Sequence, residues 1–243
     1  MSCSIKFWTL VVNVLCLPLH VVRALGLYKL YKRVTPFFFQ RMTVKYNAKM
    51  HERKMELFRG LSGFKKPGGG PLTILEIGCG TGANFKYYPP GAKVICTDPN
   101  PHFQNYLTEN MKKSEHLKYE RFVVAAGEDM SSVGDESVDV VVCTLVLCSV
   151  TDVPQTLREA HRILRPGGAF FFLEHVVADP STWSYFFQHV FQPAWYYIGD
   201  GCVVTRATWK HLEEAGFSDL QLEHVEAPLI FVLKPHILGR AVK

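Results

Sequence analysis

The sequence predicts an α/β fold with a parallel, doubly wound sheet. From Pro71 onward, short apolar runs alternate with amphipathic stretches, as in chains built from strand–helix repeats. The runs are nearly continuous in β-branched and aromatic residues, which is typical of strands covered on both faces. A chain of 243 residues, nearly half of them apolar, is long enough to build an ample core around such a sheet.

The elements can be assigned in order along this part of the chain. Strands are predicted at 72–77, 92–98, 118–124, 138–146 and 168–176, and two closing extended segments at 219–226 and 229–238. Helices are predicted at 101–113 and 154–164, and one more after Thr205, ended by Gly216.

The N-terminus is a different kind of segment. Residues 7–22 are apolar except for Thr9, Asn13, Pro18 and His20, and basic residues follow. Because a spanning helix needs about 20 apolar residues and Pro18 would kink it, the segment is marginal as a span. The alternatives are a cleaved signal peptide, a spanning signal-anchor, a monotopic anchor and a buried helix that caps the domain. An uncleaved anchor, spanning or monotopic, is favoured.

Three regions follow from these patterns. Residues 1–33 are predicted to be a hydrophobic membrane anchor, 34–70 an amphipathic helical connector ending in the Pro/Gly-rich turn 65–71, and 71–243 the catalytic domain.

Composition narrows the partners and the chemistry. The net charge is +5, but no Lys/Arg run is longer than two and no zinc-finger spacing occurs, so nucleic acid is not an expected partner. The seven cysteines contain no CxxC pair, which predicts reduced thiols in a domain facing the cytosol and no metal site.

A glycine-rich turn joins the first predicted strand to the next element. Gly78, Gly80 and Gly82 allow the backbone to approach a ligand closely, and Asp98 ends the second strand, where a carboxylate can bind two ribose hydroxyls. The glycines also fit a dinucleotide pattern, so an NAD-linked oxidoreductase is an alternative. Glu76 argues against it, because a carboxylate would repel a pyrophosphate and would attract the cationic S-adenosylmethionine.

Several motifs in the predicted domain resemble those of class I methyltransferases. ILEIGCGTGAN, VICTDPN, SVDVVVCTLVL and VTDVPQTLREAHRILRPGGAFFFLEH follow in the family's order across residues 72–176. The resemblance implies a Rossmann-like, seven-stranded, mostly parallel sheet whose last two strands form an antiparallel hairpin. It implies S-adenosylmethionine as the cofactor. The residues it places at the cofactor are Glu76, Gly78, Cys79, Gly80, Gly82, Asp98, Pro99, Asn100, Glu128, Asp129, Thr144 and Leu145. Ala126 departs from the family pattern, which often has an aspartate there.

A narrower resemblance covers nearly the whole chain. RFVVAAGEDM, VVVCTLVLCSV and the tail PHILGRAVK are similar to the methyltransferase-like 7 proteins, microsomal alkyl thiol S-methyltransferases of endoplasmic reticulum and lipid-droplet membranes. This implies methylation of small lipophilic thiols, with hydrogen sulfide as a further acceptor, by an enzyme on the cytosolic face of the membrane; we expect a monomer. The alternatives are a methyltransferase that acts on a lipid or a protein, and a membrane or lipid-droplet adaptor without catalysis.

Two regions are predicted to form the acceptor pocket: 144–147, past the fourth strand, and the aromatic insertion 179–204. His175 and Asp200 are the candidate general bases. Cys148 and Cys202 are interpreted as packing residues, because direct methyl transfer needs no enzyme nucleophile.

Overall fold

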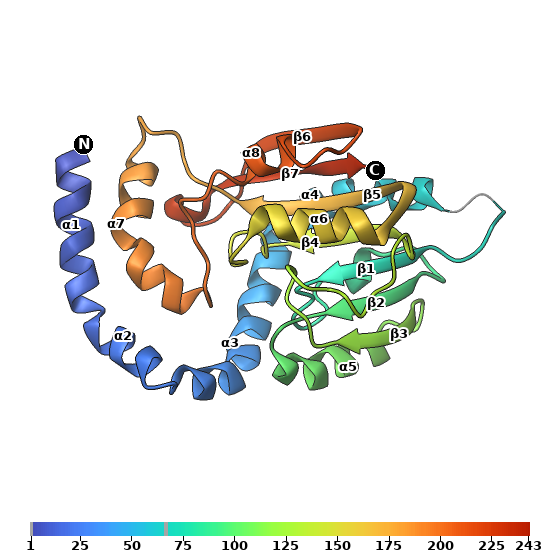
Figure 1. Cartoon of the computed structure of the whole chain (residues 1–243), viewed down its shortest axis with the longest axis horizontal. Coiled ribbons are helices and arrows are strands. Elements are labelled where there is room, and N and C mark those ends of the chain that lie inside the picture. The colour runs from blue at the N-terminus through green and yellow to red at the C-terminus, as the bar shows by residue number, and fades with distance from the viewer. Residues whose placement is uncertain (1, 66–67) are drawn as a thin grey trace.

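A computed structural model describes residues 2–65 and 68–243. One seven-stranded sheet runs in the order β3-β2-β1-β4-β5-β7-β6, with helices on both faces (Figure 1). Strands β1 to β5 are parallel, and β7 is antiparallel to both β5 and β6, which confirms the predicted fold class. The strands are β1 (Thr73–Ile77), β2 (Lys93–Thr97), β3 (Lys118–Val123), β4 (Val138–Thr144), β5 (Leu164–His175), β6 (Asp219–Glu226) and β7 (Pro235–Val242).

The helices alternate with the strands after a helical N-terminal region. They are α1 (Ser2–Leu15), α2 (Leu17–Ala24), α3 (Tyr28–Lys49), α4 (His51–Arg59), α5 (Gln104–Lys112), α6 (Val153–Ile163), α7 (Trp183–Ile198) and α8 (Thr208–Glu213). Short 3₁₀ turns are η1 (Gly60–Phe64), η2 (Phe85–Tyr87), η3 (Pro101–Phe103) and η4 (Phe231–Leu233).

The last strand differs from the prediction. An extended segment was expected at 229–238, but β7 begins at Pro235 and η4 occupies part of the expected range. The reason is tertiary: backbone oxygens of Phe231 and Val232 accept hydrogen bonds from Ser184 and Gln188 of α7, at 3.0 and 2.9 Å. The segment therefore turns against α7 before it enters the sheet.

Successive side chains along each strand point to opposite faces of the sheet, and this creates two hydrophobic cores, one on each face. Ile74 and Val140 point to one face, where they pack with Met50 and Phe58 from the α3–α4 region. Their neighbours Leu75 and Val141 point to the other face, toward α6 and α8. Near-continuous apolar strands thus serve two layers of helices, as the sequence pattern predicts.

The α6 helix shows how the sequence shapes one of these layers. The Asp152 side chain accepts a hydrogen bond from the Gln155 N–H at 2.9 Å and so caps the helix start. Val153, Leu157 and Ala160 recur at helical spacing and are buried against the sheet.

Helices α1, α2 and the start of α3 form an arc beside the sheet, and α1 packs along α7 (Figure 1). Within the described residues no single helix is long and apolar enough to cross a bilayer. By length and composition, Cys3–Leu15 and Leu17–Ala24 could do so together as a pair bent by 54°. Pro18 lies in the first turn of α2, next to this bend, as predicted.

The predicted connector is part of longer elements. Helix α3 runs through the division between residues 33 and 34, so anchor and connector are continuous in the backbone. Met50, Phe58 and Leu61 are buried against the sheet, as the helical spacing indicates. Residues 66 and 67 of the predicted turn lie outside the described residues.

Candidate active site

A cavity of about 470 Å³ opens where the parallel strands end. That volume lies within the range of small-molecule sites. The loops after β1, β2 and β4 and the last residue of β5 line it, while α3 and the loop after α7 form the opposite wall. Eleven of the residues predicted from sequence line this cavity: Glu76, Gly78, Cys79, Gly80, Asp98, Pro99, Glu128, Thr144, Leu145, His175 and Asp200.

The glycine turn lets two loops meet. Gly78 has φ of +59°, and a Cβ added there would lie 2.5 Å from Cγ2 of Val146, in the loop after β4. Val146 is itself held because its N–H donates to the buried Glu174 carboxylate at 2.9 Å. A side chain at position 78 would therefore push apart the two loops that line the cavity.

Replacing Gly78 with alanine is expected to cost more stability than backbone strain alone. Gly91 is the matched control, because it also has positive φ, +80°, but nothing lies within 4 Å of an added Cβ. We expect Gly91→Ala to lose about 1–2 kcal/mol and Gly78→Ala a further ~1–3 kcal/mol from overpacking. Urea unfolding of both variants tests this, and equal losses would contradict the close approach of Val146.

Asp98 is placed at the end of β2 to receive a polar ligand. Its carboxylate accepts hydrogen bonds from the N–H groups of Gly80 at 3.1 Å and Asn100 at 2.8 Å. Only 6% of the residue is exposed. Burial raises its pKa to about 6, although the two backbone hydrogen bonds favour the ionised form. Donated hydrogen bonds from ribose hydroxyls would favour that form further.

Glu76 lies in a buried charge network. Its carboxylate accepts hydrogen bonds from the Asn84 amide and the Tyr88 hydroxyl, each at 2.7 Å. Asn84 also accepts a hydrogen bond from Lys54 at 2.8 Å, so its amide group bridges a buried cation and a buried anion. Burial raises the pKa of Glu76 to about 7 and lowers that of Lys54 to about 7.

The charges of Lys54 and Glu76 are complementary to the carboxylate and the ammonium of a bound amino acid. Lys54 donates two hydrogen bonds within the protein, to Asn47 and Asn84, and an ammonium has three protons. Lys54 and Glu76 both line the cavity. Together they fit the carboxylate and ammonium of the methionyl part of S-adenosylmethionine.

Asp200 already holds two hydrogen-bond donors from α3. Its carboxylate accepts hydrogen bonds from the Tyr28 hydroxyl at 2.8 Å and from the Lys32 ammonium at 2.7 Å. Both donors belong to the first turns of α3, so Asp200 fastens this helix to the loop after α7. That Asp200 removes a proton stays a prediction, and the two donors that its oxygens hold indicate a positioning role.

Three predicted cofactor residues do not line the cavity. Gly82, with φ of +76°, instead allows the loop to pass Phe85, whose ring would clash with an added Cβ. Asn100 caps η3 and donates to the Lys32 carbonyl at 2.9 Å. Asp129 is exposed, and its carboxylate accepts from the Ser131 N–H at 3.2 Å. Direct cofactor contact is therefore not supported for these three.

The remaining predicted residues occupy the rim or the floor. Glu128 lines the cavity, but one oxygen accepts N–H bonds from Thr151 and Asp152. The Thr144 hydroxyl accepts a hydrogen bond from Asn84 at 2.9 Å. Leu145 has φ of +58°, a strained conformation for a non-glycine residue, and such strain is often found at functional sites.

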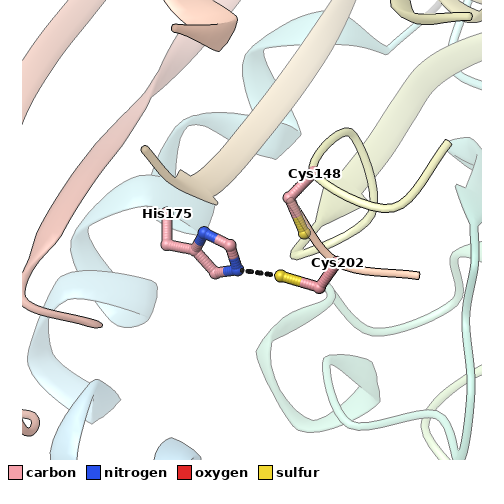
Figure 2. Close-up of side chains that lie close together, drawn as sticks. All are labelled: Cys148, His175 and Cys202. Atoms are coloured by element: carbon pink, nitrogen blue, oxygen red, sulfur yellow. Dashed lines mark hydrogen bonds between the residues drawn. The ribbon is translucent and has the colours of Figure 1, made fainter. Parts of the chain in front are cut away.

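His175 lies at the end of β5 in a cluster with two cysteines (Figure 2). Its Nε2 is 2.8 Å from Sγ of Cys202, and Cys148 completes the cluster. Hydrogen bonding to Cys202 lowers the pKa of Cys148 well below its usual value, despite burial. The interpretation of both cysteines as packing residues is therefore incomplete, because their sulfur atoms face an imidazole at the cavity wall.

Sequence reasoning missed most of the wall opposite the strands. Phe39, Met42 and Tyr46 of α3 line the cavity, and so do Lys54 and Asn84. No short motif marks the α3 positions or Lys54 of α4, because this region is predicted only as a connector. Asn84 ends the motif ILEIGCGTGAN, but the sequence assigns it no role. The aromatic insertion 179–204 does reach the cavity, through Trp195 and Cys202, as predicted.

Comparison with known proteins agrees with this geometry. Residues 75–172 match a family model described as "Methyltransferase domain". The chain is 57% identical over 213 residues to human thiol S-methyltransferase TMT1A, covering 87% of each chain. It is 49% identical over 245 residues to human thiol S-methyltransferase TMT1B, covering 100% of each.

Solved structures support the fold. A SAM-dependent methyltransferase from Aquifex aeolicus superposes with a TM-score of 0.57 at 16% identity, covering 85% of this chain and 97% of that one. The [4+2]-cyclase SpnF gives a TM-score of 0.61 at 14% identity, with coverage of 88% and 93%. SpnF is named as a cyclase, so the fold alone does not determine the reaction.

Sequence identity to these relatives assigns the family, which the shared fold does not do. Human TMT1B aligns over the whole chain and human TMT1A over 87% of it, and the cavity presents an acidic strand end and a glycine turn suited to a nucleoside. The chain therefore belongs to the thiol S-methyltransferase family and is an S-adenosylmethionine-dependent methyltransferase.

Proposed function

We propose that this chain transfers the methyl group of S-adenosylmethionine to the sulfur atom of small, lipophilic alkyl thiols, and also to hydrogen sulfide. One cavity with two different ends is the observation that carries this. Gly80 and Asp98 line the cavity and suit the cofactor, and the apolar residues Trp195, Leu229 and Leu233 line it as well. Trp195 and Leu233 pack with Cys148 and Cys202, and we assign this part of the cavity as the acceptor end. The names of the human relatives support a thiol as the acceptor.

The route to the cavity favours lipophilic acceptors. Ile230 and Phe231 are 61% and 45% exposed, and they lie between the cavity-lining residues Leu229 and Leu233. An apolar segment thus joins the outer surface to the acceptor end. We assign this segment as the entry for a thiol dissolved in a lipid phase.

The reaction requires mainly that the acceptor sulfur and the methyl group are aligned. Methyl transfer is an in-line displacement in which the acceptor sulfur approaches the methyl carbon at roughly 3–3.5 Å. Thiolate is the reactive form, and with an ordinary pKa near 8.5 a few per cent of a thiol is ionised at neutral pH. Residues of α3 and Trp195 of α7 form walls of the cavity, and displacement of water when the substrates bind would strengthen electrostatic interactions there.

A paired acceptor assay tests the thiol assignment. Full-length protein in detergent is incubated with methyl-labelled S-adenosylmethionine and either 1-hexanethiol or 1-hexanol, which differ only in the acceptor atom. We expect labelled hexyl methyl sulfide and no labelled ether, and labelled methanethiol when hydrogen sulfide is supplied. Label found only on hexanol, phospholipid or protein would overturn the proposal.

We further propose that the N-terminal helices anchor the protein to the cytosolic face of the endoplasmic reticulum and to lipid droplets. Large apolar side chains on α1, on α2 and just after α2 are exposed, among them Phe7, Leu15 and Leu25 at 59%, 73% and 69%. Apolar area of this kind marks a lipid or protein contact. The bend between the helices suits a monotopic anchor, and a lipid droplet with a single leaflet requires one.

Charged substitutions on this apolar surface are expected to release the protein from membranes. Burying one leucine contributes ~1.5–3 kcal/mol, so Leu15→Glu with Leu25→Glu should weaken vesicle binding at least roughly 100-fold. Val124→Glu is the control, since Val124 is 56% exposed and follows the edge strand β3, outside the N-terminal helices.

Flotation with phosphatidylcholine–phosphatidylserine vesicles measures the effect. Equal flotation of the Leu15/Leu25 variant and wild type would contradict the anchor. Microscopy of the tagged chain in lipid-loaded cells checks the location. The expected monomeric state stays a prediction that native mass spectrometry can test.

A further inference from the structure

Three side chains of metal-ligand type converge at the acceptor end of the cavity. Cys148 follows β4, His175 ends β5, and Cys202 lies in the loop after α7. Their ligand atoms all lie within 4.8 Å of one another, and each residue is buried, at 1%, 7% and 4% exposure. In Figure 2 the two sulfur atoms and Nε2 of the imidazole point toward one another.

The protein holds these groups in place through their surroundings. The N–H of Val203 donates to the carbonyl of Cys148 at 2.9 Å, which ties the two cysteine loops together. The indole of Trp195 donates to Sγ of Cys202 at 3.1 Å. His175 pairs with His236 across β5 and β7. The arrangement is therefore built into the sheet and its loops rather than formed by mobile side chains.

The cluster is also distinctive within the molecule. Across residues 2–65 and 68–243, no other group of three histidine, cysteine or acidic side chains brings its ligand atoms this close together. Ordinary packing at this wall would need only small apolar groups. Two thiols and an imidazole, drawn from three separate parts of the chain, indicate a more specific use.

We propose that Cys148, His175 and Cys202 bind one zinc ion, whose fourth position faces the cavity and receives the sulfur of the substrate. Thiolate and imidazole ligands together suit Zn²⁺, which is four-coordinate in proteins. Structural zinc sites use four protein ligands, whereas reactive sites use three and leave one position open. The inference rests on the proposed thiol acceptor, because the open position is assigned to its sulfur.

The chemistry balances without any further reactant. On binding, the thiol loses its proton to solvent and becomes a zinc-bound thiolate, since a coordinating thiol is deprotonated outright. Its sulfur then forms a bond to the methyl carbon while the bond to the sulfonium breaks. That electron pair stays on the sulfur of S-adenosylhomocysteine. The neutral thioether product is a weaker ligand than a thiolate and leaves. In this arrangement His175 is a ligand, not the general base.

Metal analysis of the intact protein tests the site directly. Full-length chain is purified in detergent without chelators, and zinc is measured by mass spectrometry alongside Cys148→Ser, Cys202→Ser and the double variant. We expect about one zinc per chain in the wild type and loss of most of it in the variants. Cys3→Ser, at an exposed cysteine outside the cluster, is the matched control and should retain the metal.

A second readout does not depend on activity. Cobalt exchanged into the wild-type protein should show thiolate-to-cobalt charge-transfer absorption and the visible bands of a tetrahedral site. Adding 1-hexanethiol without cofactor should shift both. S-adenosylmethionine binding by each variant shows that it is folded, because Asp98 and Gly80 lie outside the cluster.

The outcomes separate the two proposals. Metal-free protein that methylates hexanethiol and is insensitive to chelators would overturn the zinc site and leave the thiol activity standing. Zinc-loaded protein that methylates only a non-thiol acceptor would overturn the thiol activity and the assignment of the open position, while the metal site itself would stand. Copper in place of zinc, or zinc retained in the double variant, would also overturn the inference.

Discussion

Replacing Asp98 with alanine is expected to abolish measurable binding of S-adenosylmethionine and, with it, methyl transfer. The carboxylate is the acidic end of β2, inside the cavity and positioned for the two ribose hydroxyls. Each hydrogen bond to a charged acceptor contributes about 1.5–3 kcal/mol, so losing two weakens binding roughly 10²- to 10⁴-fold. Isothermal titration calorimetry on detergent-solubilised protein measures this loss.

Two further variants separate charge from structure. Asp98→Asn keeps the size of the side chain but has only one acceptor oxygen for the N–H groups of Gly80 and Asn100, so we expect an intermediate loss. Asp179→Ala removes an exposed aspartate that contacts only its own turn, through Ser181, and should bind as the wild type does. Tight binding by a folded Asp98→Ala protein would contradict the ribose assignment.

The same carboxylate predicts a pH dependence. The pKa of Asp98 is raised to about 6 by burial, and the ribose hydroxyls donate to the ionised form. Protonation therefore competes with the cofactor, and affinity should fall about tenfold for each pH unit below 6. Above pH 6, affinity should be nearly constant with respect to this group. Asp98→Asn should lose this acid limb, which distinguishes Asp98 from other titrating groups.

Replacing Lys54 with methionine is expected to cost about 3–5 kcal/mol of unfolding free energy. Lys54 and Glu76 are each only 2% exposed, and Asn84 connects their charges. Removing one charge of a buried pair leaves the other uncompensated. Lys86→Met is the matched control, because Lys86 lies two residues after Asn84 but is exposed, and it should change stability by no more than about 0.5 kcal/mol.

The direction of the pH effect on this variant follows from Glu76. Its folded-state pKa is raised to about 7 even with Lys54 present, mainly because it is buried. Without the lysine the ionised carboxylate is less favourable still. Since a raised acid pKa means that the folded state prefers the protonated form, Lys54→Met should lose further stability as pH rises through 7.

A double-mutant cycle shows whether the two charges act as a pair. Lys54→Met combined with Glu76→Gln should cost less than the sum of the single changes, by about 0.5–3 kcal/mol. Urea unfolding monitored by circular dichroism gives all four free energies. Additive losses would show that Asn84 does not couple Lys54 to Glu76.

The features of the fold and of the candidate site that the sequence predicts correctly depend on residues that are neighbours along the chain. The strand ending at Glu76, the glycine turn and the acidic residue Asp98 are close in sequence, and each follows from strand burial and turn chemistry. Parallel strands place their carboxyl ends at one edge, so the cofactor end of the cavity follows from the order of the elements. Family resemblance supplied the hairpin of β6 and β7 and the thiol acceptor.

Asp129 and Asp200 show where such reasoning stops. Their carboxyl groups fit the expected chemistry, but hydrogen bonding decides what each one does. Asp129 turns outward to its own loop, and Asp200 pairs with Tyr28 and Lys32 of α3. Neither partner can be inferred from spacing, because a side chain's partner depends on which elements the fold brings beside it.

The sequence by itself determined the sheet, the nucleoside-binding turn and the apolar N-terminus, because each depends on residues that are close together along the chain. Only the tertiary structure placed α3 across the ends of the strands, joined buried Lys54 to Glu76, and gathered Cys148, His175 and Cys202. His175 and Cys202 are 27 residues apart, and Cys148 is as far again upstream, so no short ligand motif exists. Contacts between distant segments arise from packing free energy shared over the whole core, which local pattern does not contain.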